Sequence, residues 1–430
     1  MSNTATLKLE AIPVDKEVEN LIRSSDKLSV GFGQTENVNY GPDPIGLDIL
    51  PESTRQRLVE SGIDISKGYP SRPDKSLVPV FLDEATAIRD DDYEYIERGK
   101  NADPEKKALF GAAKEVINLT KHVGTEIVGL QLEDLNDKQK DELALLVAER
   151  VVVFFRDQKL SPQKQLELGD YWGRAERHPQ TSQVNGVPGV SVIWVDYYRK
   201  SYGLNLTFKN NALGNWDATK HTVRGPQVWH TDLVHEKRPS GITHLHLDAI
   251  PNVGGDTSWA SGYAAYDKLS ESFKKFLDGK KAVYVSAHGY LDRKNPFSGP
   301  KRIERVHPLV RTHPATGWKF LYVNRTMTKR ILGVSSVESD LILNYLFEVY
   351  EKNADIQARF KWTPSSKPGY GTSAIWDNRV SQHSAAWDHE GNESRHGTRV
   401  TSLAEIPYFD PESKSQREDL GLSLDERDFF

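Results

Sequence analysis

The 430-residue sequence contains no cysteine, which excludes disulfide bonds, thiolate metal sites and a cysteine nucleophile. The absence of cysteine is typical of a reducing compartment, and any transition metal must be bound by histidine or carboxylate side chains. No run of about 18 apolar residues is present, and the N-terminus lacks an apolar core behind basic residues. We therefore expect a cytoplasmic protein with no membrane partner.

The sequence also lacks an excess of basic charge. Its 56 lysine and arginine residues are outnumbered by 61 aspartate and glutamate residues, which gives a net charge of −5. This balance provides no electrostatic reason to expect a nucleic-acid partner. With 37% hydrophobic and 27% charged residues, the composition is typical of a globular chain that buries a sizeable core.

The composition changes along the chain. Residues 1–112 are rich in charged residues, proline and glycine, and we interpret them as an N-terminal extension that wraps the core. Residues 113–408 are expected to form the catalytic domain. Within it, residues 196–227 are predicted to be a lid insertion, because a polar and aromatic loop of that length is typically functional or disordered. Residues 409–430 are interpreted as a charged tail.

Local signals predict the secondary structure of the catalytic domain. Asn136 with Gln139, and Ser335 with Glu338, have the spacing of capping boxes that begin helices. A serine followed by proline at Ser161 predicts another helix start. The expected strands include VVVFF, THLHLDAI, KAVYVSAH, WKFLYVN and TSAIWD. This content predicts a mainly β fold with flanking helices, in which the strands form a rolled antiparallel barrel.

Two histidines and one aspartate form a candidate metal site. His230 and Asp232 are two residues apart, so in a strand their side chains project to the same face. His383, which follows the aromatic segment AIWDNR, is the best candidate for a third ligand. Two imidazoles and one carboxylate form the facial triad that binds catalytic Fe(II) and leaves coordination positions open.

A second histidine pair is an alternative to this site. His244 and His246 are also two residues apart on a strand-like run. We rank this pair lower because no nearby carboxylate with comparable geometry follows it. A single histidine in a globular protein is more often an ordinary core or surface residue than a metal ligand.

Two arginines follow His383 with a spacing that suits an anion site. Arg395 and Arg399 are four residues apart, which in an extended segment directs both guanidinium groups to one face. Arginine forms bidentate pairs with carboxylates and keeps its charge when partly buried. With the hydroxyl of Thr257, Arg395 is suited to bind the distal carboxylate of a molecule whose other end chelates iron. 2-Oxoglutarate has this shape.

The segments between Val123 and Leu403 resemble a known enzyme family. The motifs VGTEIVGLQLEDL, VVFFRDQKLSPQKQ, WHTD, GGDTSWASGYAAYDKLS, WDNRVSQHS and RHGTRVT occur in this order. They are similar to the taurine/2,4-D group of Fe(II)- and 2-oxoglutarate-dependent dioxygenases, especially the sulfonate dioxygenases. The resemblance implies a double-stranded β-helix, or jelly roll, with Fe(II), 2-oxoglutarate and O2 as the reacting partners. It also implies a homo-oligomer.

The resemblance further implies roles for individual residues. The implied iron ligands and catalytic residues are His230, Asp232 and His383. The implied 2-oxoglutarate-binding residues are Thr257 and Arg395, and the implied substrate-binding residues are Arg399 and His178. The family's taurine enzymes carry other residues at the positions of Thr181, Pro226 and Met327, so a substrate other than taurine itself is expected.

These features predict an oxidoreductase that hydroxylates a C–H bond of a small anionic substrate. The leading substrate is an alkyl sulfonate, which would yield an aldehyde and sulfite. The alternative is stable hydroxylation of an amino acid or a dicarboxylate such as glutamate, as in secondary metabolism. Two other classes remain: a zinc hydrolase, which Arg395 disfavours, and an inactive binding protein, which the complete set of three candidate ligands disfavours.

Overall fold

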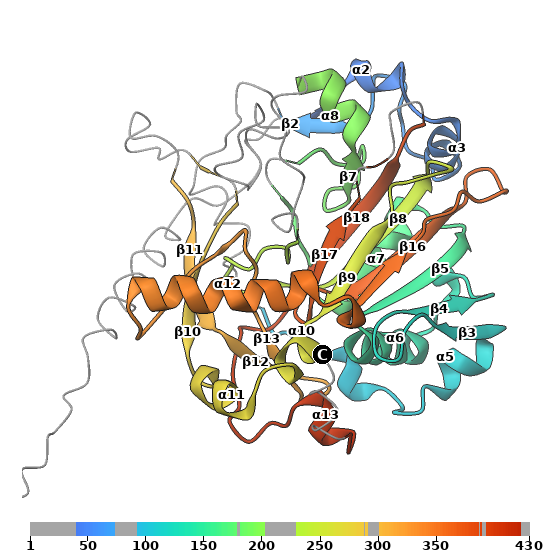
Figure 1. Ribbon diagram of the computed structural model, residues 1–430. Helices are drawn as coiled ribbons and strands as arrows, with labels where there is room; N and C mark the ends of the chain where they lie inside the picture. The colour runs from blue at the N-terminus through green and yellow to red at the C-terminus, as the bar shows by residue number, and fades with distance from the viewer. Residues whose placement is uncertain are drawn as a thin grey trace, which may run out of the picture.

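The computed structural model describes residues 40–73, 93–178, 181–202, 229–287, 289–290, 301–386, 388 and 393–422. Its architecture is mainly β, with helices around the sheets (Figure 1), as the sequence predicts. Most of the predicted lid at residues 196–227 lies outside the described residues, and residues 196–202 belong to helix α8 (Val195–Tyr202). None of the helices within these ranges is long and apolar enough to cross a membrane.

The largest sheet provides one wall of the candidate site. In the described part of the chain it has eight strands, in the order β3-β4-β5-β16-β8-β18-β6, with β7 paired to β18. All of these pairs are antiparallel except that of β4 with β5. The strands are β3 (Glu115–Asn118), β4 (Thr125–Val128), β5 (Val152–Gln158), β6 (Arg174–Ala175), β7 (Ser191–Trp194), β8 (Ser240–Ala249), β16 (Gly371–Asp377) and β18 (His396–Leu403).

A smaller sheet shares a buried core with the large one. Its strands, in the order β15 (Gln357–Phe360), β9 (Thr257–Ser261) and β17 (Ser381–Ala385), are antiparallel. Phe154 of β5 stacks on Phe360 with 3.7 Å between ring centroids and meets the edge of Trp259 at 5.2 Å. Aromatic pairs in these geometries stabilise a core beyond the area that they bury. These contacts hold the two sheets together.

Helices cover the opposite face of the large sheet. Helices α6 (Asp137–Arg150) and α7 (Pro162–Trp172) pack Leu146 and Trp172 into one cluster with Phe155 of β5. Because β5 has packing on both faces, its apolar residues form a continuous run instead of an alternating pattern.

The remaining elements surround these sheets, and Figure 1 shows α12 crossing in front of the strands β10 and β11. The other strands are β1 (Tyr40–Pro42), β2 (Ser71–Pro73), β10 (Lys281–Val285), β11 (Glu304–Pro308), β12 (Val310–Thr312), β13 (Lys319–Leu321) and β14 (Thr328–Ile331). The other helices are α2 (Pro44–Leu47), α3 (Glu52–Glu60), α5 (Lys107–Ala112), α10 (Gly262–Asp267), α11 (Glu271–Leu277), α12 (Ser336–Lys352) and α13 (Gln416–Asp419), with 3-10 turns η3 (Arg98–Asn101), η4 (Leu132–Asp134) and η7 (Ala354–Ile356).

The predicted helix starts are confirmed. At α6, the Asn136 side chain accepts the backbone N–H of Gln139, and the Gln139 side chain accepts the backbone N–H of Asn136, both at 3.0 Å. Ser335 and Glu338 form the same reciprocal pair at α12. Each pair satisfies two backbone donors that a helix start otherwise leaves without partners.

Residues 40–73 are anchored to the large sheet through Arg57 of α3. Its guanidinium forms an ion pair with Asp248 of β8 at 2.8 Å, and both side chains are at most 2% exposed. The same guanidinium donates to the hydroxyl of Thr398 at 3.1 Å. Asp248 also contacts Nδ1 of His396 at 2.7 Å. One buried polar cluster therefore joins the N-terminal segment to both β8 and β18.

Candidate active site

His230 and His383 face each other across a backbone pairing. The amide of His230 donates to the carbonyl of His383 at 3.1 Å, and the amide of His383 donates back at 2.9 Å. Directly opposed residues of an antiparallel pair project their side chains to the same face. The two imidazole centroids are accordingly 4.3 Å apart. On its other side, β17 pairs with β9, which fixes His383 in the small sheet.

Asp232 lies in a turn, which differs from the regular strand that the His-x-Asp spacing predicts. His230 forms an isolated bridge, and the chain begins to turn at Asp232. Hydrogen bonds hold this segment in place: the hydroxyl of Thr231 donates to the carbonyl of Ser381 at 2.6 Å, and the amide of Asp232 donates to the side-chain oxygen of Asn378 at 3.4 Å. These contacts keep the Asp232 carboxylate beside the two imidazoles.

The three side chains offer donor atoms to a shared position. One ligand atom from each residue lies within 4.8 Å of the others. The carboxylate oxygens of Asp232 are 3.7 Å from Nε2 of His230 and 3.9 Å from Nε2 of His383. Burial raises the pKa of the Asp232 carboxyl, but the guanidinium of Arg399, with further contributions from His383 and His230, outweighs burial and lowers this pKa to about 2. Burial lowers the pKa of His383 to about 3.

This donor set fits a divalent transition metal. An ionised carboxylate and a neutral imidazole are the protonation states that bind metal ions. Among the described residues, this is the only group of three histidine or carboxylate side chains with the closeness that a shared ion requires. Two nitrogen ligands and one oxygen ligand are the set found in non-haem Fe(II) oxygenases.

Arg399 of β18 borders the three-residue cluster. Its Nη1 lies 3.3 Å from Oδ2 of Asp232, and 25% of the arginine side chain is exposed. A guanidinium group has five N–H donors in a planar fork, so the contact with Asp232 occupies only part of it. The remaining donors are suited to an anion that binds next to the metal position.

Arg395 is a buried cation, and no carboxylate pairs with it in the described ranges. The residue is 4% exposed, and its Nε donates to the carbonyl of Gly255 at 3.3 Å. Burial lowers the pKa of Arg395 to about 10, so the side chain is charged at neutral pH. A buried charge without a counter-ion is costly, and this position therefore favours an anionic ligand.

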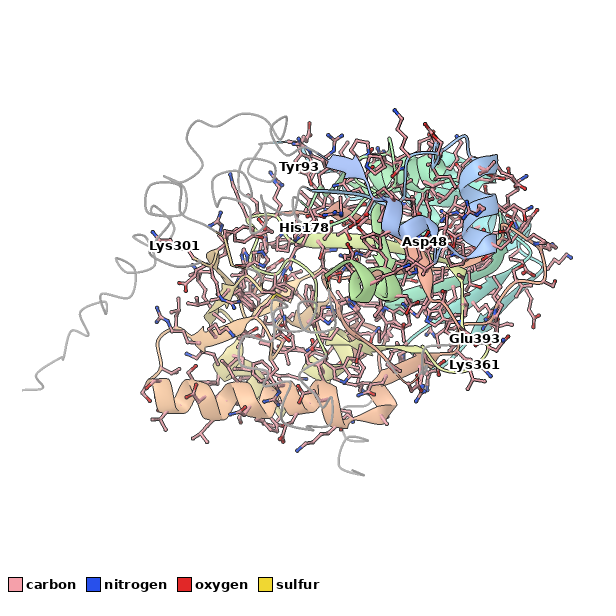
Figure 2. All side chains as sticks on the ribbon, turned by 90° about the horizontal axis from the view of Figure 1, so that it is seen from above. Asp48, Tyr93, His178, Lys301, Lys361 and Glu393 are labelled. Atoms are coloured by element: carbon pink, nitrogen blue, oxygen red, sulfur yellow. The ribbon has the colours of Figure 1, made fainter. Side chains whose placement is uncertain are left out.

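Trp362 contacts both Thr257 and Arg395. Its indole Nε1 donates to the hydroxyl of Thr257 at 3.0 Å, and its ring centroid lies 6.0 Å from Cζ of Arg395. Thr257 and Arg395, the two residues predicted to bind the carboxylate, therefore both lie next to the side chain of Trp362. In Figure 2, Lys361 and Glu393, which are close to Trp362 and Arg395 in sequence, lie at the same end of the molecule.

His178 is buried on the segment that follows β6. Strands β6 and β7, on either side of this segment, both pair with β18, which carries Arg399. Ser191 of β7 lies directly opposite Arg399, and its hydroxyl is 3.4 Å from the hydroxyl of Thr181. The strands on both sides of His178 thus pair with the strand that carries the predicted substrate arginine.

The alternative histidine pair is placed elsewhere. His244 and His246 of β8 both lie 2.9 Å from the hydroxyl of Ser373 on β16. Burial lowers the pKa of His244 to about 3 and that of His246 well below its usual value. These two imidazoles therefore contact a serine on the neighbouring strand, and no carboxylate within the described residues joins them in a metal-binding group.

Asn378 and Trp362 contact candidate site residues, and neither was predicted from the sequence. Asn378 contacts the backbone of Asp232 from 146 residues away, and Trp362 contacts Thr257 from 105 residues away. Asn378 lies within the WDNR segment, which was the available signal, whereas nothing in the local sequence distinguishes Trp362 from other core tryptophans.

Comparison with known proteins identifies the family. Residues 115–401 match the model of the family described as "Taurine catabolism dioxygenase TauD, TfdA family". An alpha-ketoglutarate-dependent sulfonate dioxygenase of Saccharomyces cerevisiae is 34% identical over 330 residues, which cover 74% of this chain and 74% of the relative. The alpha-ketoglutarate-dependent dioxygenase cnsM of Penicillium expansum is also 34% identical over 330 residues, covering 73% of this chain and 85% of the relative.

A solved structure supports the same family assignment. The crystal structure of a taurine dioxygenase from Burkholderia xenovorans aligns with a TM-score of 0.56 and 28% sequence identity, covering 70% of this chain and 92% of the other. The matched segment extends from β3 into β18 and includes all three residues of the candidate metal cluster. The chain therefore belongs to the taurine catabolism dioxygenase TauD, TfdA family and is an oxidoreductase, a 2-oxoglutarate-dependent dioxygenase.

Proposed function

We propose that this protein is an Fe(II)- and 2-oxoglutarate-dependent dioxygenase that hydroxylates a small anionic substrate, with alkyl sulfonates as the leading substrate class. The observation that carries this proposal is the convergence of His230, Asp232 and His383 beside Arg399. The sulfonate dioxygenase named among the relatives supports this substrate class.

The proposed iron ligands are Nε2 of His230, Nε2 of His383 and a carboxylate oxygen of Asp232. Ferrous iron bound there would promote the reaction of O2 with 2-oxoglutarate. That reaction releases succinate and CO2 and provides the oxidant that attacks a substrate C–H bond. The protein's own contribution is to hold the three donors on one side of the metal, so that the other positions stay open. Asn378 and Thr231 hold the Asp232 segment for this purpose.

We assign the distal carboxylate of 2-oxoglutarate to Arg395 and Thr257. Arg395 is buried without a carboxylate partner among the described residues, and Thr257, which is 4% exposed, lies on the adjoining sheet. A carboxylate bound there would accept a charge-assisted hydrogen bond from the guanidinium. It would also neutralise a buried cation that no carboxylate of the described residues pairs with.

We assign the substrate anion to Arg399 and His178. The contact of Arg399 with Asp232 fixes the guanidinium at the edge of the metal position, so a bound anion would place its neighbouring carbon near the reacting oxygen. Hydroxylation of the carbon that bears a sulfonate gives an unstable 1-hydroxysulfonate. This product breaks its C–S bond and releases an aldehyde and sulfite.

The second candidate function is stable hydroxylation of an amino acid or a dicarboxylate such as glutamate. The difference from the taurine enzymes at Thr181 favours it, because the Thr181 hydroxyl lies 3.4 Å from that of Ser191, and Ser191 is the strand partner of Arg399. A carboxylate next to the hydroxylated carbon is not a leaving group under these conditions, so the alcohol would persist.

We also propose the chain's organisation. The large sheet and the β15-β9-β17 sheet would form the two halves of a double-stranded β-helix within residues 113–408. Residues 1–112 would be an extension packed on its outside, and residues 409–430 a tail. The Arg57 anchor supports this assignment for the extension.

The test is succinate release from Fe(II), 2-oxoglutarate and O2 across a panel of alkyl sulfonates, amino acids and dicarboxylates, with sulfite measured in the same wells. Equal amounts of sulfite and succinate would support the desulfonating reaction. Succinate stimulated by an amino acid or dicarboxylate without sulfite would support the second candidate. Failure of the wild type to bind 2-oxoglutarate in the presence of metal would refute both.

A further inference from the structure

Trp362 links the two residues that we assign to the distal carboxylate of 2-oxoglutarate. It is 1% exposed and follows β15, the neighbour of β9 in the small sheet. Phe360 of β15 is the backbone partner of Thr257, so Trp362 leaves the strand just beyond that pair. From there its indole reaches back to the hydroxyl of Thr257 at 3.0 Å.

The chemistry of this hydrogen bond fixes the direction of the Thr257 hydroxyl. An indole N–H is a donor only, whereas a threonine hydroxyl has one proton and two acceptor lone pairs. The Thr257 hydroxyl oxygen must therefore accept the indole N–H of Trp362. The hydroxyl proton of Thr257 is then still available for donation to a ligand. No other hydrogen bond of this hydroxyl is found in the described part of the chain. A carboxylate, which only accepts, is the matching ligand.

The same indole lies beside the second half of the site. Its centroid is 6.0 Å from Cζ of Arg395, at the outer limit of a cation–π contact. Thr257 belongs to the small sheet, whereas Arg395 directly precedes β18 of the large sheet. The Trp362 side chain thus lies against both groups.

We propose that Trp362 is a positioning residue for 2-oxoglutarate, which presents the hydroxyl of Thr257 as a hydrogen-bond donor to the distal carboxylate. This inference rests on the proposed 2-oxoglutarate site. It assigns to the indole N–H a role that is separate from the packing of the ring in the core.

The chain offers a matched control in Trp259. This tryptophan is fully buried in the same aromatic cluster, 6.4 Å from Trp362 between ring centroids, and it is two residues from Thr257 on β9. Its Nε1, however, has no hydrogen-bond partner among the described residues. Replacement of either tryptophan by phenylalanine removes one indole N–H from the same core, but only Trp362→Phe removes the bond to Thr257.

The experiment is anaerobic calorimetry on the full chain loaded with Zn(II), with 2-oxoglutarate and 2-oxobutanoate as probes. The second probe keeps the chelating end but lacks the distal carboxylate. Trp362→Phe is expected to weaken 2-oxoglutarate binding about tenfold, equivalent to about 1.4 kcal/mol, and to leave 2-oxobutanoate binding unchanged. Trp259→Phe should alter neither. With Fe(II) and O2, Trp362→Phe should raise the KM for 2-oxoglutarate at unchanged kcat.

Three results would overturn the inference: unchanged 2-oxoglutarate binding in Trp362→Phe, equal weakening of both probes, or a further loss when Trp362→Phe is added to Thr257→Val. If Trp362→Phe does not fold, Trp362→His keeps a ring N–H, and Thr257→Val against Thr257→Ser tests the hydroxyl itself. Absence of 2-oxoglutarate binding by the wild type would instead refute the proposed function.

Discussion

Replacement of Arg57 by methionine should destabilise the protein strongly, because it leaves a carboxylate buried without its ion-pair partner. Removal of one member of a buried ion pair costs roughly 3–5 kcal/mol. Asp248 would keep its contacts with Nδ1 of His396 and the hydroxyl of Thr54, both at 2.7 Å. We therefore expect the lower end of that range, a loss of about 3 kcal/mol in the free energy of unfolding.

The assay is urea unfolding of the full chain, followed by circular dichroism and tryptophan fluorescence. Arg55→Met is the matched control on the same helix, because Arg55 is 3.8 Å from Glu52 and these side chains are 39% and 87% exposed. An exposed pair of this kind contributes at most about 1 kcal/mol. Similar losses for the two variants would refute the reasoning. Combining Arg57→Met with Asp248→Asn should cost less than the sum of the single changes.

Three further predictions concern the site and the core. Arg395→Ala should abolish 2-oxoglutarate binding measured by calorimetry, while Arg399→Ala should keep it and lose substrate-dependent succinate release; equal loss of 2-oxoglutarate binding would contradict these roles. Dialysis against EDTA should abolish turnover, and Fe(II) rather than Zn(II) should restore it; recovery with Zn(II) would count against an oxygenase. Because burial lowers the pKa of His244 to about 3 and also lowers that of His246, the unfolded chain binds more protons below about pH 6.5. The free energy of unfolding should therefore decrease as the pH falls from about 6.5 towards about 3, because the two buried histidines stay neutral only in the folded state. In His244→Asn, the urea midpoint should depend less on pH over this range.

The features that the sequence predicted correctly depend on short-range chemistry. The capping boxes at Asn136 and Ser335 require only residues three positions apart, and both form as predicted. The mainly β class with flanking helices followed from strand-like segments, and the strand pairs of the large sheet are antiparallel apart from β4 with β5. The hydrogen bonds of a capping box involve only residues three positions apart, so they can be predicted without knowledge of the tertiary structure.

Features that depend on contacts between segments far apart in the sequence could not be predicted from residue spacing or hydrophobic pattern. The two-residue spacing alone did not separate His230 with Asp232 from the pair His244 with His246, and the first was preferred because of the residues around it. All ten residues of β8 are buried, so hydrophobic alternation does not indicate which face meets the centre of the molecule. The partners of Trp362 and Arg57 likewise depend on the meeting of segments more than 100 residues apart.

The reciprocal backbone hydrogen bonds between His230 and His383 make the distance between these two proposed ligands independent of the length of chain that connects them. Main-chain register, and not the path of the intervening loops, sets the distance between the two imidazoles. Lengthening a flexible surface loop costs little free energy. Insertions between these histidines could therefore reshape the surroundings of the proposed substrate site while the two imidazoles keep their spacing.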